Sequence, residues 1–241
     1  MTTTATLRPQ WAIAARQLTE SHLYLLRWLL VVGALLVAGA HVLVTVFGWE
    51  RIVYAPFGTH TATWFAFALG ITFVVAYLPL HVTSGMTRRS FIRGNLTTSP
   101  VMGVLYGLSL FALVAIERAI FDVGLPEQFA ALPGWGGSWT MLVSQILLTT
   151  VAILSGSLVG ITYYRFGGLR GTLLLLLTVL PLLVAILALD PSGGVQNFVT
   201  GTEEFVFNPA LGITVAAVCL IPPAVAFSLL TRRIPIKAVE A

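Results

Sequence analysis

The sequence predicts an all-α membrane protein that forms a single transmembrane domain of six membrane-crossing helices. Of its 241 residues, 57% are hydrophobic and only 9% are charged, whereas soluble domains carry about 25% charged residues. The mean hydropathy is +0.93. The apolar residues gather in runs of about 20, the length that a helix needs to cross the hydrocarbon core. These runs leave no room for a second, soluble domain.

The segment before the first apolar run, residues 10–27, predicts a helix of its own. Its apolar side chains recur at helical spacing, at Trp11, Ala14, Ala15, Leu18 and Leu25. This pattern is typical of an amphipathic helix that lies in the headgroup layer of the membrane. A solvated leader without a fixed position is the alternative.

Six apolar runs follow, near residues 28–48, 61–81, 100–119, 139–163, 172–189 and 210–230. Each run must be helical, because lipid offers the backbone no hydrogen-bond partner. We expect Pro181 to bend the fifth helix and the pair Pro222-Pro223 to bend the sixth. Two GxxxG patterns, Gly103 with Gly107 and Gly156 with Gly160, predict close contacts between helices of the same chain.

The basic residues predict the orientation in the membrane. Eleven of the 13 lysine and arginine residues fall on one side of the expected helices, in the N-terminal segment, the second and fourth loops and the C-terminal tail. Cytoplasmic loops carry an excess of lysine and arginine. We therefore expect a multi-pass protein of the cytoplasmic (inner) membrane with both termini in the cytoplasm. The net charge of +4 then reflects topology and does not indicate nucleic-acid binding.

Several classes of enzyme are excluded because the sequence lacks the residues that their active sites need. A P-loop needs a lysine in a glycine-rich turn, and the only lysine is Lys237 in the tail, so we expect no ATP hydrolysis by this chain. The nucleophile and histidine arrangements of rhomboid proteases and of lipid phosphatases are also incomplete. The single cysteine, Cys219, cannot form a disulfide within the chain. We expect no enzymatic activity, metal or cofactor on this chain.

Charge is also absent from the centres of the six runs, where ion-driven carriers place titratable groups. His41 is the one ionisable residue expected at depth. A lone histidine of this kind is more often a hydrogen-bonded packing residue than a proton relay. If the chain moves cargo uphill, the energy therefore enters from outside the membrane.

The loop between the second and third runs, residues 80–100, has the composition of a docking surface. It carries Arg88, Arg89 and Arg93 and no acidic residue. We expect Thr87 to cap a short helix over residues 88–95, with Phe91 and Ile92 as an exposed apolar knob. Gly85 and Gly94 are expected to permit the chain reversals on either side. The alternative is that the arginines only fix the topology.

Six spans, an amphipathic entry helix, cytoplasmic termini and the sequence Gly85-Met86-Thr87-Arg88-Arg89-Ser90-Phe91 together resemble small bacterial type-2 ABC exporter permeases. The loop YYRFGGLRG, residues 163–171, is also similar to the loop between spans four and five of that family. The resemblance implies a coupling helix that seats in a groove of a separate nucleotide-binding ATPase subunit. Its members here would be Gly85, Met86, Thr87, Arg88, Arg89, Ser90, Phe91, Ile92 and Arg93.

The same resemblance implies that ATP and Mg²⁺ bind to the partner subunit and that a second permease protomer completes a homo- or heterodimer. It also implies that spans two and five line the translocation path, with Gly70, Phe73, Tyr77 and Pro181 as wall residues. The residues themselves equally allow Gly70, Phe73 and Tyr77 to be core packing. Two other functions remain open: a gradient-driven carrier or channel, and a membrane anchor or signalling subunit that transports nothing.

Overall fold

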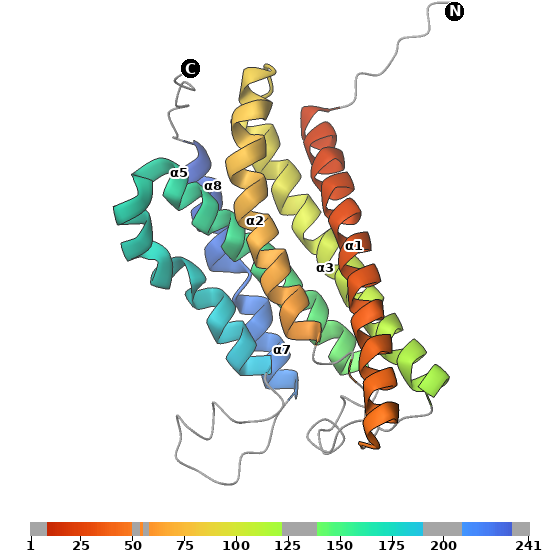
Figure 1. Cartoon of the computed structure of the whole chain (residues 1–241). Helices are drawn as coiled ribbons and strands as arrows, with labels where there is room; N and C mark the ends of the chain where they lie inside the picture. The colour runs from red at the N-terminus through yellow and green to blue at the C-terminus, as the bar shows by residue number, and fades with distance from the viewer. Residues whose placement is uncertain (1–8, 50–53, 55–57, 122–138, 190–208, 233–241) are drawn as a thin grey trace, which may run out of the picture.

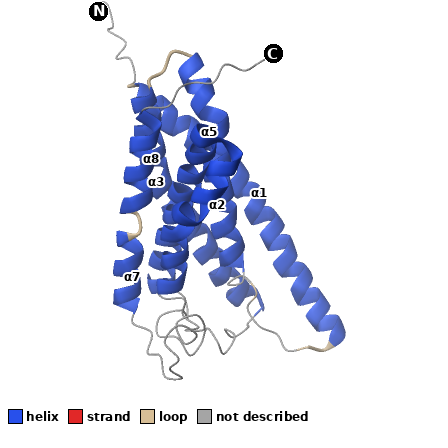
Figure 2. Ribbon diagram, turned by 90° about the vertical axis from the view of Figure 1, so that its left-hand side faces the viewer, coloured by secondary structure: helices blue, strands red, loops and turns tan. Residues whose placement is uncertain are grey.

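The structure is a computed structural model that describes residues 9–49, 54, 58–121, 139–189 and 209–232. Within these ranges the regular structure is entirely helical (Figures 1 and 2). The helices are α1 (Gln10–Phe47), α2 (Gly58–Thr83), α3 (Arg88–Phe121), α5 (Trp139–Leu189), α7 (Pro209–Val218) and α8 (Ile221–Arg232). Residues 122–138 and 190–208, which follow the third and fifth expected apolar runs, lie outside the described residues.

Five helical segments are long and apolar enough to cross a membrane. They are α1, α2, α3, α5 and the segment Ala210–Arg232, which contains most of α7 and all of α8. Large apolar side chains remain exposed on these segments; Leu36 of α1 is 69% exposed and Leu176 of α5 is 78% exposed. Soluble proteins rarely leave such surface uncovered, so the prediction of a helical membrane protein is confirmed.

The expected interfacial helix over residues 10–27 is not separate from the first span. One continuous helix, α1, covers both. No proline or glycine lies between Gln10 and Gly33, so nothing interrupts the backbone hydrogen bonds. Ala14 and Leu18 are fully buried in the bundle. The apolar stripe of residues 10–27 therefore faces other helices.

Glycines bring α2 and α3 close to α5. A Cβ atom at Gly156 of α5 would overlap the carbonyl oxygen of Phe67 in α2, and one at Gly103 of α3 would overlap the Thr150 hydroxyl in α5. The prediction that the GxxxG glycines pack within the chain is confirmed. Gly70 has the same role, because its Cβ position is occupied by the Ile153 carbonyl. It faces α5 and does not face an open path.

The long helix α5 changes direction at Gly167, whose φ of +79° is non-helical. Figure 1 shows its two arms side by side, so that the fourth and fifth expected runs form one hairpin. The second arm continues as a helix through Pro181, which is half-buried. The predicted bend in the last run is confirmed, because the helix is interrupted at Cys219 and Leu220, just before Pro222-Pro223.

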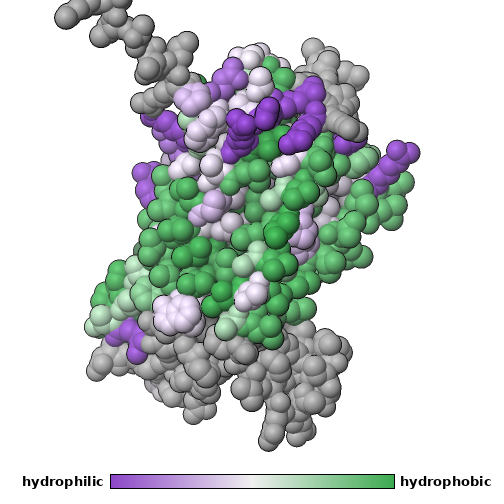
Figure 3. Space-filling view, turned by 180° about the vertical axis from the view of Figure 1, so that it is seen from behind, coloured by the Kyte–Doolittle hydropathy of each residue, from purple (hydrophilic) through white to green (hydrophobic). Residues whose placement is uncertain are grey.

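One end of the bundle gathers the polar residues. The start of α1, the turn between α2 and α3, the Gly167 turn and the end of α8 all lie at this end (Figure 1). Figure 3 shows hydrophilic residues at this end, above a broad hydrophobic belt. We call it the basic end, after the arginines of these segments: Arg16, Arg88, Arg89, Arg93, Arg165, Arg170 and Arg232.

Candidate functional site

The turn between α2 and α3 is fixed by local interactions. Gly85 has φ +82°, a conformation that costs glycine little and other residues more. The Thr87 hydroxyl accepts the Ser90 backbone N–H at 3.1 Å, which confirms the predicted cap. The Gln10 side-chain oxygen accepts the Thr87 N–H at 3.3 Å, so the start of α1 also holds this turn.

The helix that Thr87 caps does not end near residue 95, as expected, but continues to Phe121. The predicted chain reversal at Gly94 is wrong. A Cβ atom there would lie 2.7 Å from the Cβ of Ala14, so Gly94 provides the space for α1 to pack against α3. The turn therefore leads directly into a span-length helix, and no separate short helix forms within 88–95.

Phe91 and Ile92 do not form an exposed knob. Phe91 is 0% and Ile92 5% exposed. Phe91 belongs to an apolar cluster with Leu18 of α1 and Leu78 of α2, and its ring contacts the edge of His81 at 5.2 Å between centroids. Phe91 and Ile92 therefore lie on the face of α3 that turns toward the bundle.

The groups that remain on the surface are basic and polar. Arg89, Arg93 and Thr87 are exposed, Arg88 and Met86 are half-buried, and Ser90 is buried. We call the surface formed by residues 83–89 and Arg93 the arginine tip. Its charge is held on a capped helix start, and its apolar residues point inward.

Phe73 and Tyr77 lie together where α1 faces α2. Phe73 is buried and contacts the Tyr77 ring edge-on at 5.4 Å, and the Tyr77 hydroxyl lies 2.8 Å from the Ser21 hydroxyl of α1. Both residues line a cavity of about 460 Å³ between α1 and α2. Phe73 and Tyr77, which the family resemblance places in the wall of a translocation path, thus border a space within one chain.

Two buried histidines flank these aromatic residues. His22 of α1 donates from Nδ1 to the Leu18 carbonyl at 2.9 Å, and His81 of α2 donates to the Tyr77 carbonyl at 2.9 Å. Their Nε2 atoms find no hydrogen-bond partner among the described residues. His22 contacts Phe73 edge-on at 4.4 Å. No sequence pattern indicates that these histidines are buried near the same aromatic pair.

A buried acid–base pair joins α1 to α3 near the opposite end. His41 Nε2 lies 2.8 Å from Glu117 Oε1, with side-chain exposures of 4% and 1%. The same oxygen accepts the Tyr54 N–H at 2.7 Å, and the Phe121 ring stacks on His41 at 3.8 Å. The prediction that His41 is a lone histidine is therefore wrong, because Glu117 of α3 is its partner.

Compared with protein-family models, curated proteins and solved structures, the chain matches none of them. Its function must therefore be inferred from its own geometry. The described features that bear on function are the arginine tip, the space between α1 and α2, and the buried His41–Glu117 pair.

Proposed function

We propose that the chain is the membrane-spanning permease subunit of an ATP-driven ABC exporter. A separate ATPase subunit binds ATP and Mg²⁺ and docks on the arginine tip. The observation that carries this proposal is the tip itself: three arginines and an exposed turn, held rigidly by Thr87 and Gln10. A signal for topology alone would not require this fixed geometry.

In this proposal the role of Phe91 changes from docking to transmission. Arg88, Arg89 and Arg93 contact the ATPase, while Phe91 and Ile92 connect the same helical turns to the apolar cluster of α1 and α2. A displacement of the tip then moves packed side chains directly, since close-packed interiors transmit strain. The cluster includes Phe73, so the motion reaches the cavity between α1 and α2.

The proposed topology has six crossings, with the basic end in the cytoplasm of a bacterial cell and the bundle in the inner membrane. The crossings are α1, α2, α3, the two arms of α5, and α7 with α8. A second protomer, identical or related, pairs with this one. The chain alone binds no ATP and depends on its partner for transport.

Single cysteines test this orientation. In a Cys219→Ala background, we expect Trp49→Cys to react with an impermeant maleimide added outside intact cells, because Trp49 is 65% exposed beyond the end of α1. Ser84→Cys, in the exposed turn at the basic end, should react only after the cells are permeabilised. The reverse pattern would contradict the cytoplasmic position of the arginine tip.

The double variant Arg88→Ala with Arg89→Ala tests docking. Exposed ion pairs contribute up to about 1 kcal/mol each, so the loss of two should weaken ATPase binding by up to roughly thirtyfold. The effect should shrink as ionic strength rises, because salt screens exposed charges. The measurement is Mg²⁺-dependent ATPase activity that co-purifies with the chain, together with cargo movement.

A matched control removes two exposed arginines elsewhere at the same end, Arg170→Ala with Arg232→Ala. It should leave docking nearly unchanged. Equal losses in both double variants would mean that general basic charge, and not the tip, is recognised. If no ATPase activity accompanies the wild-type chain, the exporter proposal fails and a membrane anchor or signalling subunit becomes the better description.

The buried His41–Glu117 pair favours a second candidate, a gradient-driven carrier. Ionisable residues within membrane-crossing helices commonly mark proton or ion pathways. Unlike a lone histidine, this pair holds a carboxylate and an imidazole in direct contact at 2.8 Å, which is suited to exchanging a proton. The experiment that separates this candidate from the exporter is described in the Discussion.

A further inference from the structure

The outer face of α1 changes from polar to apolar partway along the helix. From the basic end onward, the exposed residues that follow one another at helical spacing are Glu20, Tyr24, Arg27, Val31 and Leu35. Arg27 is the last charged residue of α1, because no aspartate, glutamate, lysine or arginine lies between Trp28 and Phe47. In a membrane-crossing helix, such a change marks the passage from water into hydrocarbon.

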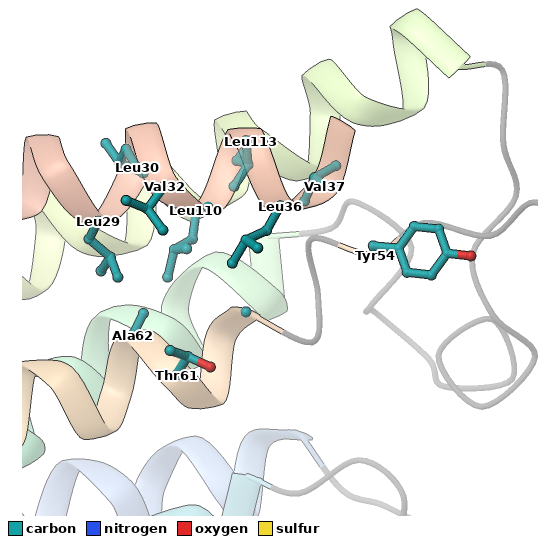
Figure 4. Close-up of a pocket in the computed structure, with 12 residues that line it drawn as sticks. Leu29, Leu30, Val32, Leu36, Val37, Tyr54, Thr61, Ala62, Leu110 and Leu113 are labelled. Atoms are coloured by element: carbon teal, nitrogen blue, oxygen red, sulfur yellow. The ribbon is translucent and has the colours of Figure 1, made fainter. Parts of the chain in front are cut away.

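The opposite face of α1 turns toward the bundle. Figure 4 shows Leu29 and Leu36 directed across a second cavity, about 400 Å³ in volume, toward Ala62 of α2. Arg27 precedes Leu29 by two residues, which is slightly more than half a helical turn. The Arg27 side chain therefore points away from α2 and toward the surrounding membrane.

Aromatic residues mark both limits of the membrane along α1. Trp28 is 50% exposed next to Arg27, and at the far end Phe47 stacks on Trp49 at 5.2 Å between centroids. Tryptophan is enriched at both interfaces between membrane and water. At 1.5 Å per residue, α1 rises about 29 Å from Trp28 to Phe47, close to the hydrocarbon thickness of about 30 Å. Arg27 therefore lies in the headgroup layer on the basic side.

The Arg27 guanidinium is positioned by two aromatic rings. Its Cζ atom lies 5.3 Å from the centroid of the Tyr24 ring and 5.8 Å from that of the Trp28 ring. Arg27 makes no hydrogen bond or ion pair with the residues that the structure describes, whereas Arg16 is paired with Glu20 at 2.6 Å. The five N–H donors of the Arg27 guanidinium are therefore available to a ligand from outside the chain.

We propose that Arg27, flanked by Tyr24 and Trp28, binds the phosphate of an anionic phospholipid in the leaflet on the basic side. A guanidinium can donate two parallel hydrogen bonds to one phosphate group. The acyl chains of the lipid extend along Val31 and Leu35, which are 44% and 68% exposed. This site does not depend on the exporter proposal, because the arginine tip takes no part in it.

The site also sets the depth of α1 in the membrane. Along its axis the helix rises about 26 Å from Gln10 to Arg27, several times the thickness of one headgroup layer, which is about 5–8 Å. The start of α1 therefore stands in water beyond the headgroups, and so does the arginine tip, whose Thr87 is bonded to Gln10.

The test titrates the purified full-length chain, in a neutral detergent, with phosphatidylglycerol and counts bound lipids by native mass spectrometry. We expect one saturable site that prefers this lipid to phosphatidylcholine. Arg27→Gln should weaken binding roughly fivefold, the contribution of one basic residue near an anionic membrane surface. Arg27→Lys should retain part of the affinity, because lysine keeps the charge but lacks the planar fork. Glycerol 3-phosphate, which carries the phosphate without acyl chains, should not compete.

The matched control is Arg93→Gln, which removes another exposed arginine of the basic end. Arg93 precedes Gly94, which packs against Ala14, and Ala14 lies about 20 Å from Arg27 along α1. This variant should bind phosphatidylglycerol as the wild type does. Equal losses in the Arg27→Gln and Arg93→Gln variants would overturn the proposal. Equal affinity for phosphatidylcholine, or effective competition by glycerol 3-phosphate, would also overturn it.

Cysteine reactivity tests the position of the membrane boundary without changing Arg27. In a Cys219→Ala background, in nanodiscs that contain phosphatidylglycerol, Gln17→Cys should react rapidly with a water-soluble maleimide. Val31→Cys should react at least tenfold more slowly, although both positions are exposed on α1. Comparable rates would overturn the placement of Arg27 in the headgroup layer. No ATPase is present in either experiment, so a failure of the exporter proposal would not alter these outcomes.

Discussion

Phe91→Ala is expected to destabilise the folded chain by about 3–5 kcal/mol, the cost of truncating a fully buried aromatic side chain. Phe91 is 0% exposed and packs against residues of α1 and α2, so its removal leaves a cavity where three helices meet. The measurement is the unfolding midpoint of the purified chain, titrated with denaturing detergent in mixed micelles. Loss of ATPase coupling should accompany the loss of stability.

Phe47→Ala is the matched control, since Phe47 of α1 is 61% exposed. This change should alter stability by no more than about 0.5 kcal/mol, as surface substitutions usually do. Similar midpoints for the two variants would show that Phe91 is not buried in the bundle. In that case Phe91 would again be a candidate contact for the ATPase.

His41→Ala is expected to cost about 1–3 kcal/mol, the range for removing one partner of a buried hydrogen bond. The variant leaves the Glu117 carboxylate in the bundle without the imidazole that it contacts at 2.8 Å. His41→Leu combined with Glu117→Leu should restore much of the stability, because replacing both hydrogen-bonding partners by apolar groups of similar shape can be nearly neutral. A double-mutant cycle of the four proteins measures the coupling.

The same double variant separates the two candidate functions. If ATP drives transport, the folded His41→Leu, Glu117→Leu chain should move cargo at a rate close to that of the wild type. A gradient-driven carrier would lose uptake, because the buried pair that exchanges the proton in that candidate would be gone. Stable folding with no transport would therefore contradict the exporter proposal and support the carrier.

Structural features that depend only on residues adjacent in the sequence could be predicted from the sequence. The Thr87 cap and the Gly85 reversal require only the few residues around them, and the bend before Pro222-Pro223 follows from the chemistry of proline. The apolar runs predicted the membrane class because their length alone is informative. Each of these inferences survives without knowledge of how the helices pack.

Features that depend on packing could not be predicted in this way. An apolar stripe such as Ala14 and Leu18 looks the same whether it faces lipid headgroups or another helix. Glycine serves both chain reversals and close helix contacts, so Gly94 was assigned to the wrong one. Glu117 lies 76 residues from His41, and no local pattern links them. The inward direction of Phe91 likewise follows from its packing against α1 and α2.

The continuity of α1 has a mechanical consequence. Its 38 residues form a rod of about 57 Å, and both ends are tied to the ends of α3, through Gln10 near one end and His41 near the other. The close contact of Ala14 with Gly94 lies near the basic end, so it can act as a pivot. Because the far end is also tied to α3, a tilt of α1 at the arginine tip carries α3 with it, up to the end where α1 leans away from α2 (Figure 2).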